Sequence, residues 1–198
     1  MLEPFLKASW LYYADNSYMS SRLLWFTGFR IESPVMAHNS IEKYLKGYLV
    51  SNGETIAKGT PAWGHNLCEL SKACANYDED FNSEPINRRL SFLERYFYHV
   101  RYPSELPNIE GISLWFSFDS NIQPLDEIVA FVRPRILLDK TDWGETEIYQ
   151  VRRSDLDTMK WKKRALEDSN AYIDLIDCEE THKTEIEFSE FNFDTGQC

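Results

Sequence analysis

Apolar residues recur along the first two thirds of the chain at the spacing of amphipathic helices. The clearest example is residues 33–50, with the sequence SPVMAHNSIEKYLKGYLV. At about 100° per residue, its apolar side chains gather on one face, while Asn39, Lys43 and Lys46 point the other way. The apolar face consists of Ala37, Ile41, Tyr44, Leu45 and Tyr48. We predict one long amphipathic helix here, around which the rest of the chain is arranged.

Local signals mark both ends of this helix. Ser33 is a residue type that accepts hydrogen bonds from free backbone N–H groups as an N-cap, and Pro34 fits a first helical turn. The segment Ser51-Asn52-Gly53 is a typical stop signal. We therefore predict a helix that begins at Ser33 and ends before Gly53.

Similar patterns predict four more helices, over residues 4–29, 65–77, 85–100 and 120–132. Residues 51–64 are rich in glycine and are predicted to form a loop. The first two helices are joined by a short turn, an arrangement that packs as an antiparallel hairpin. The fold class we expect is mainly α, an antiparallel bundle of about five helices followed by an acidic, mixed C-terminal extension.

The pattern changes at Asp139, so we predict a helical bundle over residues 1–138 and an acidic extension over residues 139–198. Within the extension, residues 145–151 are compatible with a short strand, and residues 154–169 with a helix capped by Ser154. Residues 184–193 partly alternate apolar and acidic side chains, which suits a half-buried strand or an acidic-aromatic tail.

The charge is distributed unevenly between these two parts. The net charge is −11, and residues 1–138 carry 13 basic and 16 acidic side chains, whereas residues 139–198 carry 8 and 16. An acidic protein is a poor general binder of nucleic acid, because phosphate contacts need cationic side chains. A local basic site on the bundle is still compatible with this balance.

Several functional classes find no support in the sequence. No run approaches the roughly 20 apolar residues that span a bilayer, and the amino terminus lacks the pattern of a signal peptide. We expect a cytoplasmic protein without membrane association. The sequence has no Cys-x-x-Cys or His-x-x-x-His pair, so we expect no metal site, and we expect no cofactor. His38 and His65 are interpreted as structural, with His38 half-buried at the edge of a core face.

The helix predicted over residues 85–100 has two contrasting faces. Its core stripe is expected to contain Leu90, Leu93, Phe97 and Val100. The opposite face carries Arg88, Phe92, Arg95 and His99. One alternative is that this face is solvated or forms a dimer contact in which a second subunit covers the Phe92 ring.

The other alternative is that this polar face cleaves RNA without a metal. Arg95 and His99 lie one turn apart, so their side chains can converge on one ligand. The imidazole would deprotonate a 2′-hydroxyl or protonate the leaving oxygen, and the guanidinium would stabilise the charged phosphorane.

Further candidate ligands lie nearby. Arg101 can meet a phosphate while Tyr102 stacks on a base, although Tyr102 is also suited to packing into the bundle. Lys43 and Lys46 could extend a phosphate-binding patch with Arg88, or form an ordinary solvated face. Arg88, Arg101, Tyr102, Lys43 and Lys46 are therefore the candidate nucleotide- or RNA-binding residues.

Three motifs in series resemble the HEPN domain family. They are IEKYLKGYL at residues 41–49, GHNLCEL at residues 64–70 and RYP at residues 101–103. Their order and spacing extend the resemblance over about residues 5–135. The RYP segment is similar to that of the sacsin-like branch, in which it accompanies nucleotide binding. In the ribonuclease motif of catalytic members, Arg is followed by four to six residues and a polar pair ending in His. Here three residues separate Arg95 from His99.

The resemblance implies a partner and a setting. Members of the family work on or around nucleotides and RNA, often as homodimers with polar residues of the fourth helix near the interface. Our first hypothesis is a nucleotide- or RNA-binding accessory protein of a prokaryotic toxin–antitoxin or defence system. The alternatives are a metal-independent endoribonuclease that uses Arg95 and His99, and a protein-interaction module whose acidic tail covers a basic face.

Overall fold

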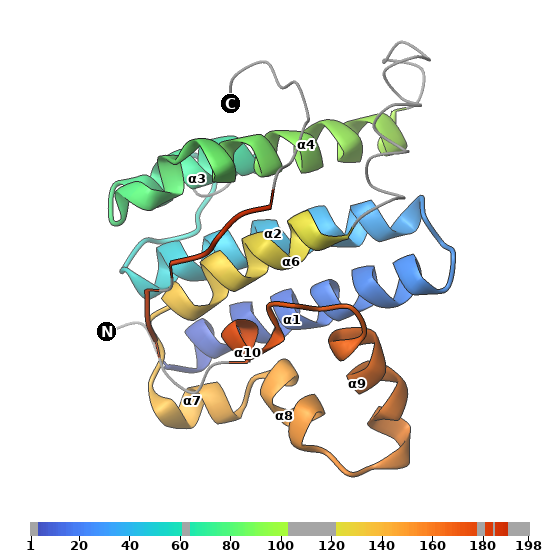
Figure 1. Ribbon diagram of the computed structural model, residues 1–198. Coiled ribbons are helices and arrows are strands. Elements are labelled where there is room, and N and C mark those ends of the chain that lie inside the picture. The colour runs from blue at the N-terminus through green and yellow to red at the C-terminus, as the bar shows by residue number, and fades with distance from the viewer. Residues whose placement is uncertain (1–3, 61–63, 103–121, 178–180, 184, 190–198) are drawn as a thin grey trace.

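The structure, a computed structural model, describes residues 4–60, 64–102, 122–177, 181–183 and 185–189. The side chains of residues 4–7, 99, 140 and 141 lie outside this description. Five longer helices form an antiparallel bundle (Figure 1), which confirms the mainly helical fold class. They are α1 (Pro4–Phe26), α2 (Glu32–Ser51), α3 (Leu67–Ala75), α4 (Glu84–Arg101) and α6 (Gln123–Val132).

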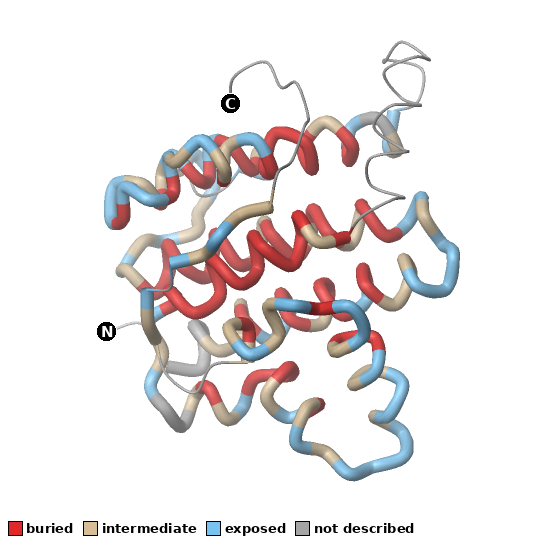
Figure 2. The backbone as a smooth tube through the Cα atoms, viewed as in Figure 1, coloured by how far each residue is buried: buried red, intermediate tan, exposed pale blue. Residues whose placement is uncertain are grey.

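The core lies around α2 and α6, which run through the middle of the molecule with α1 on one side and α3 and α4 on the other (Figure 1). All five residues of the predicted apolar face of α2 are buried, so that prediction is confirmed. Helix α6 is buried from Pro124 to Val132, as expected of a helix surrounded by other elements. Figure 2 shows this burial as red along α6 and along most of α2.

The predicted start of α2 is wrong in its detail. The helix begins at Glu32, and its N-cap residue is Ile31, whose side chain makes no capping hydrogen bond. Ser33 instead bonds to α1, because its Oγ donates to the Ser21 carbonyl at 2.8 Å and Ser21 Oγ donates to the Ser33 carbonyl at 2.9 Å. These two reciprocal hydrogen bonds hold α1 and α2 close together near the turn that joins them.

The extension also folds as short helices within its described residues. They are α7 (Lys140–Gly144), α8 (Glu147–Arg153), α9 (Lys160–Glu167) and α10 (Ile173–Ile176). The strand predicted over residues 145–151 is wrong, because the segment forms α8, which buries Ile148 and Val151 one turn apart. The helix predicted over residues 154–169 is shorter than expected, since α9 begins at Lys160 after the 3-10 turn η4 (Asp157–Met159). The predicted boundary near Leu138 stays a prediction.

Buried arginines pair with buried carboxylates inside the bundle. Four such ion pairs occur among the described residues: Arg22–Asp126, Arg89–Glu127, Arg133–Asp15 and Arg135–Asp78. Both members of every pair are almost completely buried. Buried charges of this kind are tolerated when they are paired and when their remaining donors also find acceptors.

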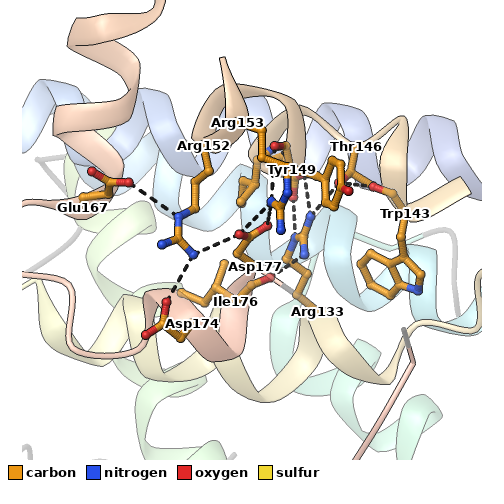
Figure 3. A network of polar contacts seen from close by, with 12 residues as sticks. Arg133, Trp143, Thr146, Tyr149, Arg152, Arg153, Glu167, Asp174, Ile176 and Asp177 are labelled. Atoms are coloured by element: carbon orange, nitrogen blue, oxygen red, sulfur yellow. Dashed lines mark hydrogen bonds and ion pairs between the residues drawn. The ribbon is translucent and has the colours of Figure 1, made fainter. Parts of the chain in front are cut away.

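In Arg22 and Arg133, those remaining donors reach the extension. Arg22 Nε donates to the Ala165 carbonyl at 2.8 Å, and its terminal nitrogen Nη2 donates to the Asp168 carbonyl. Arg133 donates to the carbonyl of Ile176 and to Thr146 Oγ1, the latter at 3.0 Å (Figure 3). Each guanidinium therefore joins a carboxylate of the bundle to acceptors of the extension.

A chain segment after α10 runs back across the bundle. We call its described residues, 181–183 and 185–189, the C-terminal strap. The His182 N–H donates to the Pro134 carbonyl at 2.8 Å, and the Ser189 N–H donates to Glu127 Oε1 at 3.0 Å. Lys183 Nζ lies 2.9 Å from Asp78 Oδ1. No strand is assigned within the strap, so the strand alternative finds no support in these residues.

We expect Arg133→Met to lower the free energy of unfolding by about 3–5 kcal/mol, because it leaves Asp15 as a buried charge without its partner. Urea unfolding of the purified protein measures this loss. Arg164→Met is the matched control, since Arg164 and Asp168 form an exposed pair that contributes about 0–1 kcal/mol. Similar small losses in both variants would contradict a stabilising role for the buried arginine.

We expect Glu127 to make stability depend on pH. Burial alone would raise the pKa of Glu127, but hydrogen bonds from Ser189 and the Arg89 charge lower it below its ordinary value of 4.5. A carboxyl with a lowered folded-state pKa contributes stability above its unfolded-state pKa and loses it as pH falls through the folded-state pKa. Wild type should therefore exceed Glu127→Gln in unfolding free energy at pH 7 by about 3 kcal/mol.

This advantage should shrink when urea unfolding is repeated at pH values below 4.5. Glu69→Gln, at an exposed position on α3, is the control and should follow the wild type across the same range. If the difference in unfolding free energy between wild type and Glu127→Gln stayed constant as the pH falls, the predicted link between the Glu127 pKa and stability would be contradicted.

Candidate functional site

Helix α4 buries more of its surface than its sequence suggests. The predicted core residues Leu90, Leu93 and Phe97 are buried, and Val100 packs partly against the core. Phe92, predicted on the outer face, is also buried within the chain, and its ring lies 6.0 Å from that of Tyr96. The hypothesis that a second subunit covers Phe92 is therefore wrong, because the chain already covers it.

The polar residues on this helix have different surroundings. Arg88 is exposed and its Nη2 lies 2.9 Å from Glu84 Oε1, whereas Arg95 is half-buried. The side chain of His99 lies outside the described residues. The convergence of Arg95 and His99 on one ligand therefore stays a prediction.

The C-terminal end of α4 presents an exposed cluster that we call the aromatic–arginine patch, consisting of Tyr98, Arg101 and Tyr102. The two tyrosines are 44% and 41% exposed, and their ring centroids lie 6.4 Å apart with an angle of 23° between the planes. Arg101 is also exposed, and its guanidinium carbon lies 5.7 Å from the Tyr102 centroid and 5.5 Å from that of Phe97. Tyr102 is therefore at the surface and not inside the bundle.

Beneath the patch lies a buried polar pair. The imidazole of His38, 1% exposed, stacks on Phe97 with centroids 3.9 Å apart. His38 Nε2 is 3.6 Å from Glu94 Oε2, and neither ring nitrogen makes a hydrogen bond with any residue that the structure describes. The prediction that His38 is half-buried is wrong, because α4 covers the ring completely.

Glu94 links this pair to the start of α3. Its Oε2 accepts the Leu67 N–H at 2.6 Å, within the segment GHNLCEL singled out from the sequence. Burial, followed by the charge of Glu94, raises the pKa of Tyr98 above its ordinary value. Tyr98 therefore keeps its proton at neutral pH, and its hydroxyl can serve as a hydrogen-bond donor.

The two candidate lysines of α2 already have partners. Lys43 Nζ donates to Ser17 Oγ at 2.7 Å, and burial lowers the pKa of Lys43. Lys46 was predicted on the outer face but is buried, with Nζ 2.8 Å from Glu42 Oε1. The position of Lys46 is thus corrected, because Glu42 allows its charge to be buried. A phosphate-binding role for either lysine stays a prediction.

A second dense group of charges belongs to the extension. Asp177 accepts hydrogen bonds from Arg152 and Arg153, each at 2.9 Å, and Arg152 also lies 3.2 Å from Asp174 (Figure 3). These contacts join α8 to α10 and neutralise acidic side chains there. Within the described residues, no group of three or more His, Cys, Asp or Glu side chains is arranged to hold a metal ion.

Sequence analysis identified Arg101 and Tyr102, interpreted His38 as structural, and did not single out Tyr98 or Glu94. Tyr98 could have been found, because it precedes Tyr102 by four residues and so shares its side of the helix. The pairing of His38 with Glu94 had no sequence signal, since the two residues come from different helices and meet through the packing of α2 against α4.

The antiparallel bundle places the chain in the class of mainly helical proteins. The model of the HEPN domain family matches residues 8–117, more than half of the chain, and the chain therefore belongs to the HEPN domain family. Neither a curated protein nor a solved structure gave a match. HEPN domains are associated with nucleotide- and RNA-related functions and with toxin or defence systems. None of the described helices is long and apolar enough to cross a bilayer.

We expect His38→Phe to raise the free energy of unfolding by about 1 kcal/mol. The phenyl ring keeps the stack on Phe97, and the change removes two buried nitrogens that have no hydrogen-bond partner among the described residues. Thermal and urea unfolding measure the effect. Phe97→Leu, which removes the stack from the other side, should destabilise the protein. Destabilisation by His38→Phe would show that the imidazole makes a favourable polar interaction.

Proposed function

We propose that this HEPN protein is a nucleotide- or RNA-binding accessory protein and that the aromatic–arginine patch is its binding surface. The observation that carries the proposal is the exposure of two nearly parallel tyrosine rings beside a guanidinium at one end of α4. The patch includes Arg101 and Tyr102 of the RYP segment, which on its resemblance to the sacsin-like branch is expected to accompany nucleotide binding.

The chemistry of the patch suits an unpaired nucleotide. Bases stack on exposed aromatic faces, and each such contact contributes about 1–3 kcal/mol. Arg101 can donate two parallel hydrogen bonds to a phosphate, and the protonated Tyr98 hydroxyl can donate to a phosphate or base acceptor. These groups can hold a ligand, and burial raises the pKa of Tyr98, so its hydroxyl stays protonated at neutral pH. We therefore favour binding over cleavage.

The proposal includes a homodimer formed through the α4 face and a toxin–antitoxin or defence setting. Because Phe92 is buried within the chain, the described surface open to a second copy at this end of α4 is the aromatic–arginine patch. A ligand held there would contact both copies. Nucleotide binding and dimer formation would then strengthen each other.

We expect a short fluorescent single-stranded RNA to bind the wild type with a shallow salt dependence. A single phosphate contact through Arg101 lowers log K by about 0.7 per tenfold rise in salt. Tyr98→Ala and Tyr102→Ala should each weaken binding about 5- to 150-fold, the equivalent of the loss of one stacking contact. Fluorescence anisotropy measures the RNA affinity of the wild type and of both variants, and its dependence on salt. ATP is added as a competitor to test mononucleotide binding.

Trp161→Ala is the matched control, because Trp161 is an exposed aromatic residue on α9 of the extension. It should bind like the wild type. The proposal fails if the wild type binds neither RNA nor ATP, or if all three aromatic variants bind alike.

The same RNA, incubated with protein in EDTA, tests the ribonuclease alternative. Intact RNA with the wild type supports a binding role alone. Cleavage that disappears in both Arg95→Ala and His99→Ala would establish the metal-independent endoribonuclease instead.

A further inference from the structure

A groove of about 630 Å³ opens between the first half of α1 and helices α7 and α8 of the extension. Figure 1 shows α7 and α8 on the far side of α1 from α4, so the groove is separate from the aromatic–arginine patch. Its volume lies in the range of pockets that hold ligands of moderate size. Both the bundle and the extension contribute to its walls, so the groove exists only when the extension is docked.

Aromatic rings form one wall of the groove. Tyr12 and Tyr13 are 43% and 60% exposed, and their rings meet edge to face with centroids 5.7 Å apart. The faces of tyrosine rings attract cations within about 6 Å through their negative quadrupole. Two adjacent tyrosines that the fold leaves exposed are thus a surface suited to a cationic group.

Carboxylates form the opposite wall. Asp142 and Glu145 line the groove, together with the amide of Gln150. Neither carboxylate forms an ion pair with a described residue, although Asp177 and Glu147 of the same extension are paired with arginine or lysine. No cationic side chain is among the described residues that line the groove. The groove therefore has acceptors for a positive charge that none of the described side chains supplies.

We propose that this groove binds arginine or lysine side chains of a basic segment of a partner protein. The cation lies against Tyr12 and Tyr13 and donates hydrogen bonds to Asp142 and Glu145, while Gln150 bonds to the backbone of the segment. A polypeptide is favoured over a free small cation because the groove is open and Tyr13 is more than half exposed. A peptide covers that ring, whereas a small cation leaves it in water.

The test uses a fluorescent peptide of alternating arginine and glycine, titrated with full-length protein in an anisotropy assay. We expect Asp142→Asn combined with Glu145→Gln to weaken binding about tenfold, because the amides still accept hydrogen bonds but lack the negative charges that strengthen them. Tyr13→Leu should weaken it about two- to fivefold, the usual size of an exposed cation–π contact. All variants should unfold at the wild-type urea concentration.

The matched control is Asp155→Asn combined with Asp157→Asn. Both residues are exposed in the extension and lie outside the groove. The two substitutions change the net charge by the same amount as the groove double variant. This variant should bind within about twofold of the wild type. Equal weakening in both double variants would overturn the proposal, since it would show general attraction to an acidic protein.

Two further measurements distinguish this proposal from binding of a small cation and from the proposed RNA-binding function. Spermidine should bind more weakly than the peptide, and tight spermidine binding that depends on the same residues would overturn the choice of a polypeptide. The groove variants should keep wild-type affinity for the RNA of the previous test. The result of the peptide assay is independent of the result of the RNA assay, because the groove and the aromatic–arginine patch share no residue.

Discussion

The structure depends on guanidinium groups buried between the helical bundle and its extension. Arg22 and Arg133 each bind a carboxylate of the bundle with some of their donors and backbone carbonyls of residues after 160 with others. An arginine buried without acceptors is costly, so each part of the chain satisfies groups that the other part leaves buried. The extension also carries most of the net negative charge. Pairs such as Arg152 with Asp177 neutralise part of that charge locally and allow short helices to pack.

The sequence predicted the bundle because burial on one helix face leaves a regular spacing of apolar residues. The stripe from Ala37 to Tyr48 is an example, and it is buried as expected. Residues 145–151 were misassigned because a short apolar run fits a strand or a helix equally well, and packing against α1 decided between them. No local pattern separates the buried Arg133 from the exposed Arg88. The partner that makes the difference, Asp15, lies 118 positions away in the sequence.

At the candidate site too, some residues could be predicted from local sequence, whereas others depend on tertiary contacts. Arg101 and Tyr102 could be identified from a short motif, and the structure places both at the surface. Tyr98 follows from helical spacing once that motif is in view. Lys46 could not be assigned correctly, because its burial depends on Glu42, which is also 3.0 Å from His65 in the segment before α3. A contact within α2 and another between α2 and the segment before α3 decided whether this lysine was available.

A net charge of −11 is compatible with an anionic ligand at the end of α4. Carboxylates paired with arginine or lysine act at a distance as dipoles, and their fields fall off faster than those of single charges. At physiological ionic strength the Debye length is about 8 Å, so charges on one side of the molecule have little effect on the other. The acidic helices lie on the far side of α1 from α4 (Figure 1). We therefore propose that the local chemistry at each surface selects its ligand, a phosphate beside Arg101 and a cation beside Asp142.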